Sequence, residues 1–125
     1  MAQSTSQRTI LVVEDELFIR MSAVAILEDA GFCVLQARNS LEALDMLSRH
    51  AETSVLMTDV RMPGAMDGLA LIAQVQIDHP SIRCVVVSAN ASIAQARSAG
   101  ASGFVAKPYL AKTIVQAAHA TAPRH

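Results

Sequence analysis

Three acidic side chains, one hydroxyl and one ammonium stand directly after apolar segments of the chain. In chain order they are Glu14 and Asp15, Asp59, Ser88 and Lys107. Carboxylates crowded at one site repel one another, and a hard divalent cation held by oxygens relieves the repulsion. Mg²⁺ fits best, because it takes one or two carboxylates and keeps positions open for phosphate oxygens. A carboxylate can also attack a phosphoryl group, while an ammonium neutralises charge and a hydroxyl donates a hydrogen bond. The set therefore indicates magnesium-dependent phosphoryl transfer.

These residues can act together only if the fold brings them to one place. Strand-like and helix-like patterns alternate five times along the chain. The predicted strands are Ile10–Val13, Phe32–Leu35, Ser54–Thr58, Cys84–Val87 and Phe104–Ala106. The predicted helices are Glu16–Ala30, one starting at Asn39, Gly68–Asp78, Ala91–Ala99 and about Leu110–Ala120. Five such βα units predict a parallel sheet with helices on both faces, and such sheets bind ligands at the carboxyl ends of their strands.

Local signals support several element ends and core positions. Gly31 is a plausible stop for the first helix, and Asn39 with Glu42 forms a capping-box-like start for the second. Leu17, Val24, Leu27 and Ala30 recur at helical spacing in the first helix. Cys33 and Cys84 lie inside apolar runs, which predicts buried free thiols rather than a disulfide or a metal pair.

Composition limits the classes of function. A chain of 125 residues, 52% hydrophobic and 17% charged, matches one globular domain. The net charge of -1 gives no reason to expect nucleic acid or an anionic membrane as a partner. No apolar run is long enough to span a bilayer, and the N-terminus carries no signal-peptide core. We therefore expect a cytoplasmic protein.

Each candidate residue also has a simpler interpretation. Asp59 could only form a turn before Pro63, Glu14 and Asp15 could cap a helix, Ser88 could cap the next, and Lys107 could be a solvated surface residue. Their joint placement favours the shared site.

Other phosphate-handling classes lack their residues here. A haloacid-dehalogenase-type phosphatase needs a second acid where Arg61 stands, and acids follow the first strand where a flavodoxin needs a phosphate cradle. The chain has no P-loop or dinucleotide motif, and its four histidines are too scattered for a transition-metal site.

Four ordered motifs resemble the receiver domain of two-component response regulators. They are V-V-E-D-E at 12–16, T-D-V-R-M-P-G at 58–64, V-V-S-A at 86–89 and F-V-A-K-P-Y at 104–109. The resemblance covers about residues 9–120, with 1–8 expected as a disordered tail and 121–125 as a C-terminal tail. It implies a flavodoxin-like (βα)5 doubly wound α/β fold with parallel strand order 2-1-3-4-5.

The resemblance also implies a role for each site residue. Asp59 would be the phosphoacceptor, with Ser88 and Lys107 acting beside it. The implied Mg²⁺ ligands are Glu14, Asp15, Asp59 and the backbone carbonyl of Arg61. Phe104 would change rotamer together with Ser88, with a plain core residue as the alternative. The Lys107–Pro108 bond is a cis candidate, and Arg61 and Asn90 would tune the phosphoryl lifetime.

The function so implied is a phosphorylation-dependent signalling switch, not an enzyme beyond its own phosphoryl acceptance and slow dephosphorylation. The phosphoryl group would come from a sensor histidine kinase or a histidine phosphotransfer protein. We expect a stand-alone receiver without an output domain, monomeric or weakly homodimeric, that meets an unknown protein through its fourth helix, fifth strand and fifth helix. The alternative is a constitutive docking module that phosphate does not switch.

Two features depart from the commonest family pattern. Family members often read M-P-x-M-D-G after the acceptor, whereas residues 62–68 here are one residue longer. Phe104 stands where tyrosine is commoner, so any switching there must work through packing alone.

Overall fold

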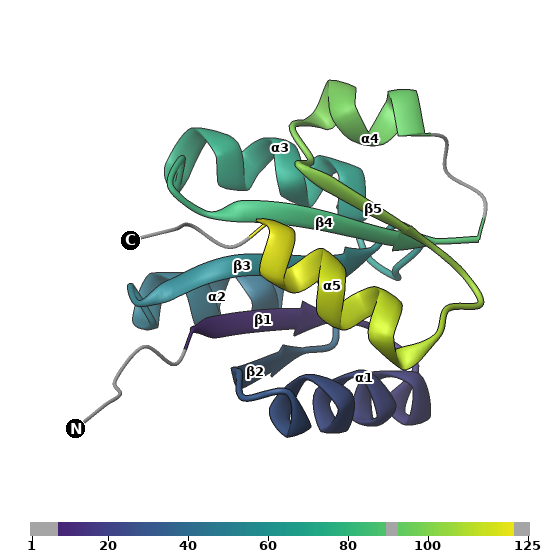
Figure 1. Cartoon of the computed structure of the whole chain (residues 1–125). Coiled ribbons are helices and arrows are strands. Elements are labelled where there is room, and N and C mark those ends of the chain that lie inside the picture. The colour runs from purple at the N-terminus through teal and green to yellow at the C-terminus, as the bar shows by residue number, and fades with distance from the viewer. Residues whose placement is uncertain (1–7, 90–92, 122–125) are drawn as a thin grey trace.

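Five parallel strands form one sheet in the order β2-β1-β3-β4-β5 in a computed structural model, which describes residues 8–89 and 93–121 (Figure 1). The strands are β1 (Thr9–Val13), β2 (Cys33–Ala37), β3 (Thr53–Asp59), β4 (Arg83–Ser88) and β5 (Gly103–Ala106). The predicted strand order and parallel sheet are confirmed. Because all strands run the same way, their carboxyl ends share one edge of the sheet.

Helices cover both faces of the sheet, as predicted (Figure 1). They are α1 (Leu17–Asp29), α2 (Ser40–Arg49), α3 (Gly68–Asp78), α4 (Ile93–Ala99) and α5 (Ala111–Thr121). Packing of α1 and α5 closes one core, and α2, α3 and α4 close the other. Right-handed crossovers require this two-sided cover, since successive parallel strands are joined through a helix on one face or the other. None of the described helices has the length and apolarity to cross a membrane.

The central strands are buried on both faces. All five residues of β1 are buried, and alternate ones enter opposite cores, Ile10 with Leu27 and Ile114, and Leu11 with Leu71. Each fully buried aliphatic side chain contributes about 2 kcal/mol of hydrophobic stabilisation. The rigid centre of the sheet therefore fixes the strand ends from which Glu14 and Asp59 project.

Helix ends follow the predicted signals. Gly31 has a φ of 100°, which L side chains rarely adopt, and it follows the end of α1. The Asn39 side chain accepts the Glu42 N–H at 2.9 Å, and Glu42 reaches back to the Arg38 N–H at 2.8 Å. The capping interaction at the start of α2 is thus present, with its return bond one residue before the cap.

Some boundaries differ from the sequence predictions. Phe32 lies before β2, Glu16 caps α1 instead of belonging to it, and α5 runs from Ala111 to Thr121. Arg8, expected in the tail, accepts a backbone hydrogen bond from Cys33 at 2.9 Å. The remaining tail residues, 1–7 and 122–125, and the predicted helix start at 91–92 lie outside the described residues.

One burial prediction was wrong, and two residues at helical spacing lie outside the core. Cys33 is exposed, although both cysteines are free as expected, because β2 is an edge strand. Leu17 is the first residue of α1 and Ala30 is the C-cap residue that follows it, and both are exposed. Ala23, Val24 and Leu27 make the buried face of this helix.

Candidate functional site

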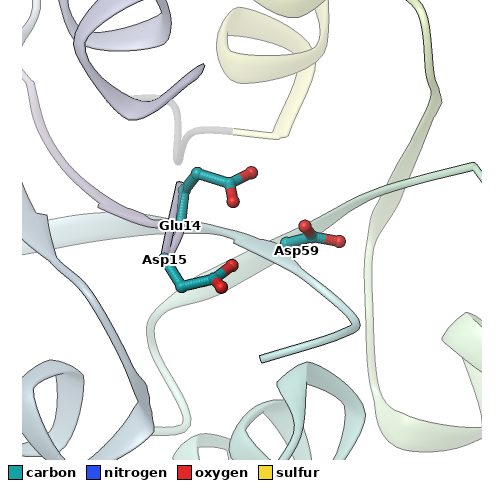
Figure 2. Close-up of side chains that lie close together, drawn as sticks. All are labelled: Glu14, Asp15 and Asp59. Atoms are coloured by element: carbon teal, nitrogen blue, oxygen red, sulfur yellow. The ribbon is translucent and has the colours of Figure 1, made fainter. Parts of the chain in front are cut away.

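Three carboxylates meet at the carboxyl edge of the sheet. Glu14 and Asp15 follow β1, and Asp59 ends the neighbouring strand β3. One oxygen of each lies within 4.8 Å of the other two (Figure 2). Glu14 is buried, Asp59 is half-buried and Asp15 is exposed. The structure therefore brings together the three acids that the sequence singled out.

Lys107, directly after β5, joins two of these acids. Its Nζ lies 2.9 Å from Asp59 Oδ2 and 3.1 Å from Glu14 Oε1. Burial raises the pKa of Glu14, and the nearby charge of Asp59 adds to the increase. Burial alone would lower the pKa of Lys107, but the hydrogen bonds that its ammonium donates to Asp59 and Glu14 outweigh burial and raise that pKa. The ammonium thus stays charged between the two carboxylates.

Glu14 is held at every polar group by its neighbours. Its N–H donates to the Ala37 carbonyl at 3.1 Å, and its Oε2 accepts the Glu16 N–H at 3.1 Å. The Glu14 carbonyl accepts a 2.8 Å hydrogen bond from Nη1 of Arg20. The side chain that caps α1 is Glu16, which accepts the Phe18 N–H at 3.0 Å, so Glu14 and Asp15 are not needed for that cap.

The backbone around Asp59 is fixed by a close approach of α3. Asp59 Oδ1 accepts the Val60 N–H at 2.7 Å, and the Val60 carbonyl accepts the Gly68 N–H at 2.8 Å. A Cβ at position 68 would collide with the Asp59 carbonyl, so only glycine fits there.

The longer loop before α3 is tied down at its far end. Gly64 has a φ of 104°, Ser40 Oγ donates to the Met66 carbonyl at 2.9 Å, and Asp67 caps α3 by accepting the Ala70 N–H at 2.9 Å. A hollow of about 310 Å³ lies between this loop and the start of α2. The extra residue is therefore accommodated without displacing Gly68 from the Asp59 backbone.

Ser88 and Phe104 lie on adjacent strands near this edge. Ser88 ends β4 and is buried, and its carbonyl accepts the Lys107 N–H at 3.0 Å. The peptide bond between Lys107 and Pro108 is cis. Phe104 is half-buried in β5 and lines a hollow of about 210 Å³ together with α4 residues.

Of the two residues expected to tune the phosphoryl lifetime, only Arg61 belongs to the described part of the chain. Arg61 is exposed in the segment after β3. Asn90 lies outside the described residues.

Comparison with known proteins matches residues 10–119 to the response regulator receiver domain. The chain belongs to this receiver domain family. Receiver domains are signalling switches rather than conventional enzymes; they bind Mg²⁺ in an acidic pocket and interact with histidine kinases and phosphotransfer proteins.

Relatives of this receiver domain differ in length. It is 34% identical over 116 residues to the chemotaxis protein CheY of Bacillus subtilis, covering 90% of this chain and 95% of that protein. It is 36% identical over 110 residues to the sensor kinase CckA of Brucella abortus, covering 85% of this chain but only 12% of that protein. CheY4 of Vibrio cholerae has the same fold, with a TM-score of 0.85 and 25% identity over 93% of this chain and 99% of that one.

The donor set of this receiver domain suits Mg²⁺. All three clustered side chains offer carboxylate oxygens, the ligands of a hard cation, and no histidine or cysteine belongs to the cluster among the described residues. The exposed Asp15 leaves one side of the cluster accessible to water and phosphate oxygens.

Sequence reasoning missed Arg20. This arginine is buried in α1 and hydrogen-bonds the Glu14 carbonyl, but nothing in the helical pattern distinguishes it from a solvated arginine. Its position six residues after Glu14, early in the helix that follows the acidic turn, is the sequence feature that could have pointed to it.

Proposed function

We propose that Asp59 of this receiver domain accepts a phosphoryl group from a phosphohistidine of a sensor histidine kinase or a histidine phosphotransfer protein. Mg²⁺ would be held by Glu14, Asp15, Asp59 and the Arg61 carbonyl. The observation that carries the proposal is the convergence of three carboxylates within 4.8 Å, with the Lys107 ammonium 2.9 Å from Asp59.

The transfer is a direct displacement at phosphorus. An Asp59 carboxylate oxygen forms the new O–P bond while the N–P bond of the phosphohistidine breaks, and the departing imidazole keeps the electron pair. Lys107, already at Asp59, pairs with a phosphoryl oxygen, and the Ser88 hydroxyl donates to another. Bound Mg²⁺ would neutralise the remaining charge on the phosphoryl oxygens.

Incubation with acetyl phosphate tests the acceptor without a partner protein. Wild-type protein should gain one phosphoryl group, detected by intact mass and removed by hydroxylamine, only when Mg²⁺ is present. Asp59→Ala should gain none, whereas Asp78→Ala, which changes an exposed acid at the end of α3, should behave as wild type. A wild-type protein that never gains the group would contradict the proposal and favour the constitutive docking module.

The output would pass through the face formed by α4, β5 and α5. Ser88 would move toward the phosphoryl group, and the half-buried Phe104 would turn into the vacated space and change the hollow against α4. A protein that reads this face would then bind one state more tightly. Phe104→Ala should uncouple the phosphorylation state from binding without preventing phosphorylation.

Arg61 would tune how long the phosphoryl group remains. Its exposed side chain stands two residues after the acceptor, where it can pair with the phosphate or obstruct the attacking water. Arg61→Ala should change the decay rate of the aspartyl phosphate; an unchanged rate would remove this role.

The phosphodonor would dock on an apolar groove beside the site. The groove, about 550 Å³, lies between α1 and the segment after β5. Lys107 lines both this groove and the small cavity that Glu14 and Asp59 line. Phe18, on its α1 side, is 77% exposed. Phe18→Ser should slow transfer from a phosphorylated histidine phosphotransfer protein but not from acetyl phosphate. Ile77→Ser, an equally exposed change on α3, should slow neither.

A further inference from the structure

Arg20 is a buried cation that faces the acidic turn. Its residue is 9% exposed, and its guanidinium makes two hydrogen bonds. Nη1 donates to the Glu14 carbonyl at 2.8 Å, and Nε donates to Gln36 Oε1 at 3.1 Å. The side chain therefore links α1, the end of β1 and the edge strand β2.

No direct ion pair accounts for the burial of Arg20, whose charge acts on the Glu42 carboxylate only from beyond ion-pair distance. Among the described residues, no carboxylate oxygen lies within ion-pair distance of its guanidinium, so its donors go to neutral oxygens. Taking a cation out of water costs free energy unless its donors are used well. An arginine exposed to water on α1 would avoid that cost. The burial of Arg20 therefore calls for a role for the two hydrogen bonds that it donates.

Two hydrogen bonds to the main chain of Glu14 fix the turn that carries the acids. The Glu14 N–H is held by Ala37 of β2, and the Glu14 carbonyl is held by Arg20. Gln36, the residue before Ala37 in β2, orients the guanidinium. The peptide that joins Glu14 to Asp15 is thereby fixed through its oxygen. Without Arg20 that carbonyl would lose its partner, and the turn could shift.

We propose that Arg20 is a positioning residue for the magnesium site, which makes this inference dependent on the proposed function. It holds the peptide between Glu14 and Asp15 so that the Asp15 carboxylate stays within 4.8 Å of those of Glu14 and Asp59. Arg20 contacts neither the ion nor the phosphoryl group in this role. Its effect is on Mg²⁺ affinity, through the positions of the ligands.

Mg²⁺ titration of the full chain tests the role directly. The chain has one tyrosine and no tryptophan, and Tyr109 lines the same cavity as Glu14, Asp59 and Lys107, so its emission is an intrinsic probe of the site. Arg20→Ala should weaken Mg²⁺ binding about tenfold, the lower end of the range for removing a partner of a metal ligand.

Two milder variants grade the effect. Arg20→Lys, which can donate to the Glu14 carbonyl but lacks the guanidinium fork, should lose less Mg²⁺ affinity than Arg20→Ala. Gln36→Ala, which removes only the orienting bond, should also lose less.

A charge-matched control separates geometry from electrostatics. Arg49→Ala removes the same charge from an exposed pair with Asp45 on α2. It should leave the Mg²⁺ affinity unchanged. An equal loss in Arg20→Ala and Arg49→Ala would overturn the positioning role, because net charge alone would then explain both.

Phosphorylation by acetyl phosphate supplies a second measurement. The Mg²⁺ concentration for half-maximal rate should rise in Arg20→Ala, while the rate at saturating Mg²⁺ should stay within about twofold of wild type, because Arg20 acts through the ligands. A merely structural role would lower thermal stability without this separation.

The outcomes distinguish this inference from the proposed function. Wild-type binding of Mg²⁺ with unchanged affinity in a folded Arg20→Ala would overturn the role of Arg20 alone. Absence of Mg²⁺ binding in the wild type would overturn the proposed function and this role together. If Arg20→Ala does not fold, unchanged affinity in both Arg20→Lys and Gln36→Ala would overturn the role.

Discussion

Two groups of charges in this receiver domain contrast in burial and balance. At the carboxyl edge, the side chains of Glu14, Asp59 and Lys107 are 7%, 14% and 20% exposed, and a third acid lies beside them. On α2, Asp45 and Arg49 pair one to one, and each side chain is 61% exposed. The edge group holds three acids against one ammonium, while the α2 pair is balanced.

The contrast shows where charge supports the fold and where it does not. An exposed pair four residues apart on a helix adds about 0.3–0.5 kcal/mol, and water solvates both groups if the pair is lost. Buried charges lose hydration, and unbalanced ones also repel each other. The edge group therefore costs stability in the metal-free protein, which is consistent with its retention for binding a cation and a phosphoryl group.

The largest effect is expected from removing the ammonium. Lys107→Ala leaves the Glu14 and Asp59 carboxylates without their shared donor, so the free energy of unfolding without Mg²⁺, measured with urea, should fall by about 2 kcal/mol. Millimolar Mg²⁺ should restore part of the loss. Lys112, the other lysine of the chain, is exposed, so Lys112→Ala should change the free energy of unfolding by less than about 0.5 kcal/mol. Equal losses of stability in the two variants would contradict the difference between buried and exposed charges.

A smaller effect of opposite sign is expected from neutralising the exposed acid. Asp15→Asn removes one of three like charges, so the metal-free protein should gain about 1 kcal/mol, the size of a like-charge interaction near 4 Å in water. The same variant should lose the increase in melting temperature that Mg²⁺ gives the wild type. Asp78→Asn, an exposed acid away from the site, serves as the control and should change neither quantity. If metal-free Asp15→Asn were less stable than wild type, repulsion among the three acids would not be what destabilises the metal-free protein.

The smallest effect is expected on α2. Arg49→Ala breaks the pair with Asp45 and should lower the free energy of unfolding by no more than about 0.5 kcal/mol. Salt screens exposed charges, so the difference should shrink further in concentrated NaCl. If Arg49→Ala lowered the free energy of unfolding nearly as much as Lys107→Ala, the exposed pair would contribute as much stability as the buried group, and the contrast would be wrong.

The position of the site was predictable because parallel strands end at one edge. Residues that follow β1, β3, β4 and β5 come close together whatever the conformation of the loops. The apolar strands and the residues after them were therefore sufficient to predict where the site lies. The strand order came from the family resemblance rather than from periodicity. For that reason the fold and the acidic cluster were anticipated in detail.

Features that depend on packing depth were not predictable. Leu17 is exposed and Arg20 is buried, the reverse of what their hydrophobicity predicts. Leu17 is the first residue of α1, whereas the Arg20 side chain hydrogen-bonds Glu14 and Gln36. Cys33 is exposed because β2 lies at the sheet edge; the predicted strand order placed β2 there, but the burial prediction relied on the apolar run alone. Such errors arise where tertiary placement, not local pattern, decides burial.

Locating the phosphoryl group on the chain tests the central claim most directly. Protein phosphorylated by acetyl phosphate with Mg²⁺ would be reduced with borohydride, which converts an aspartyl phosphate to homoserine, and its peptides would be sequenced by mass spectrometry. The account predicts homoserine at position 59 and at no other position. Homoserine at position 15, or no converted residue in protein that binds Mg²⁺, would contradict it.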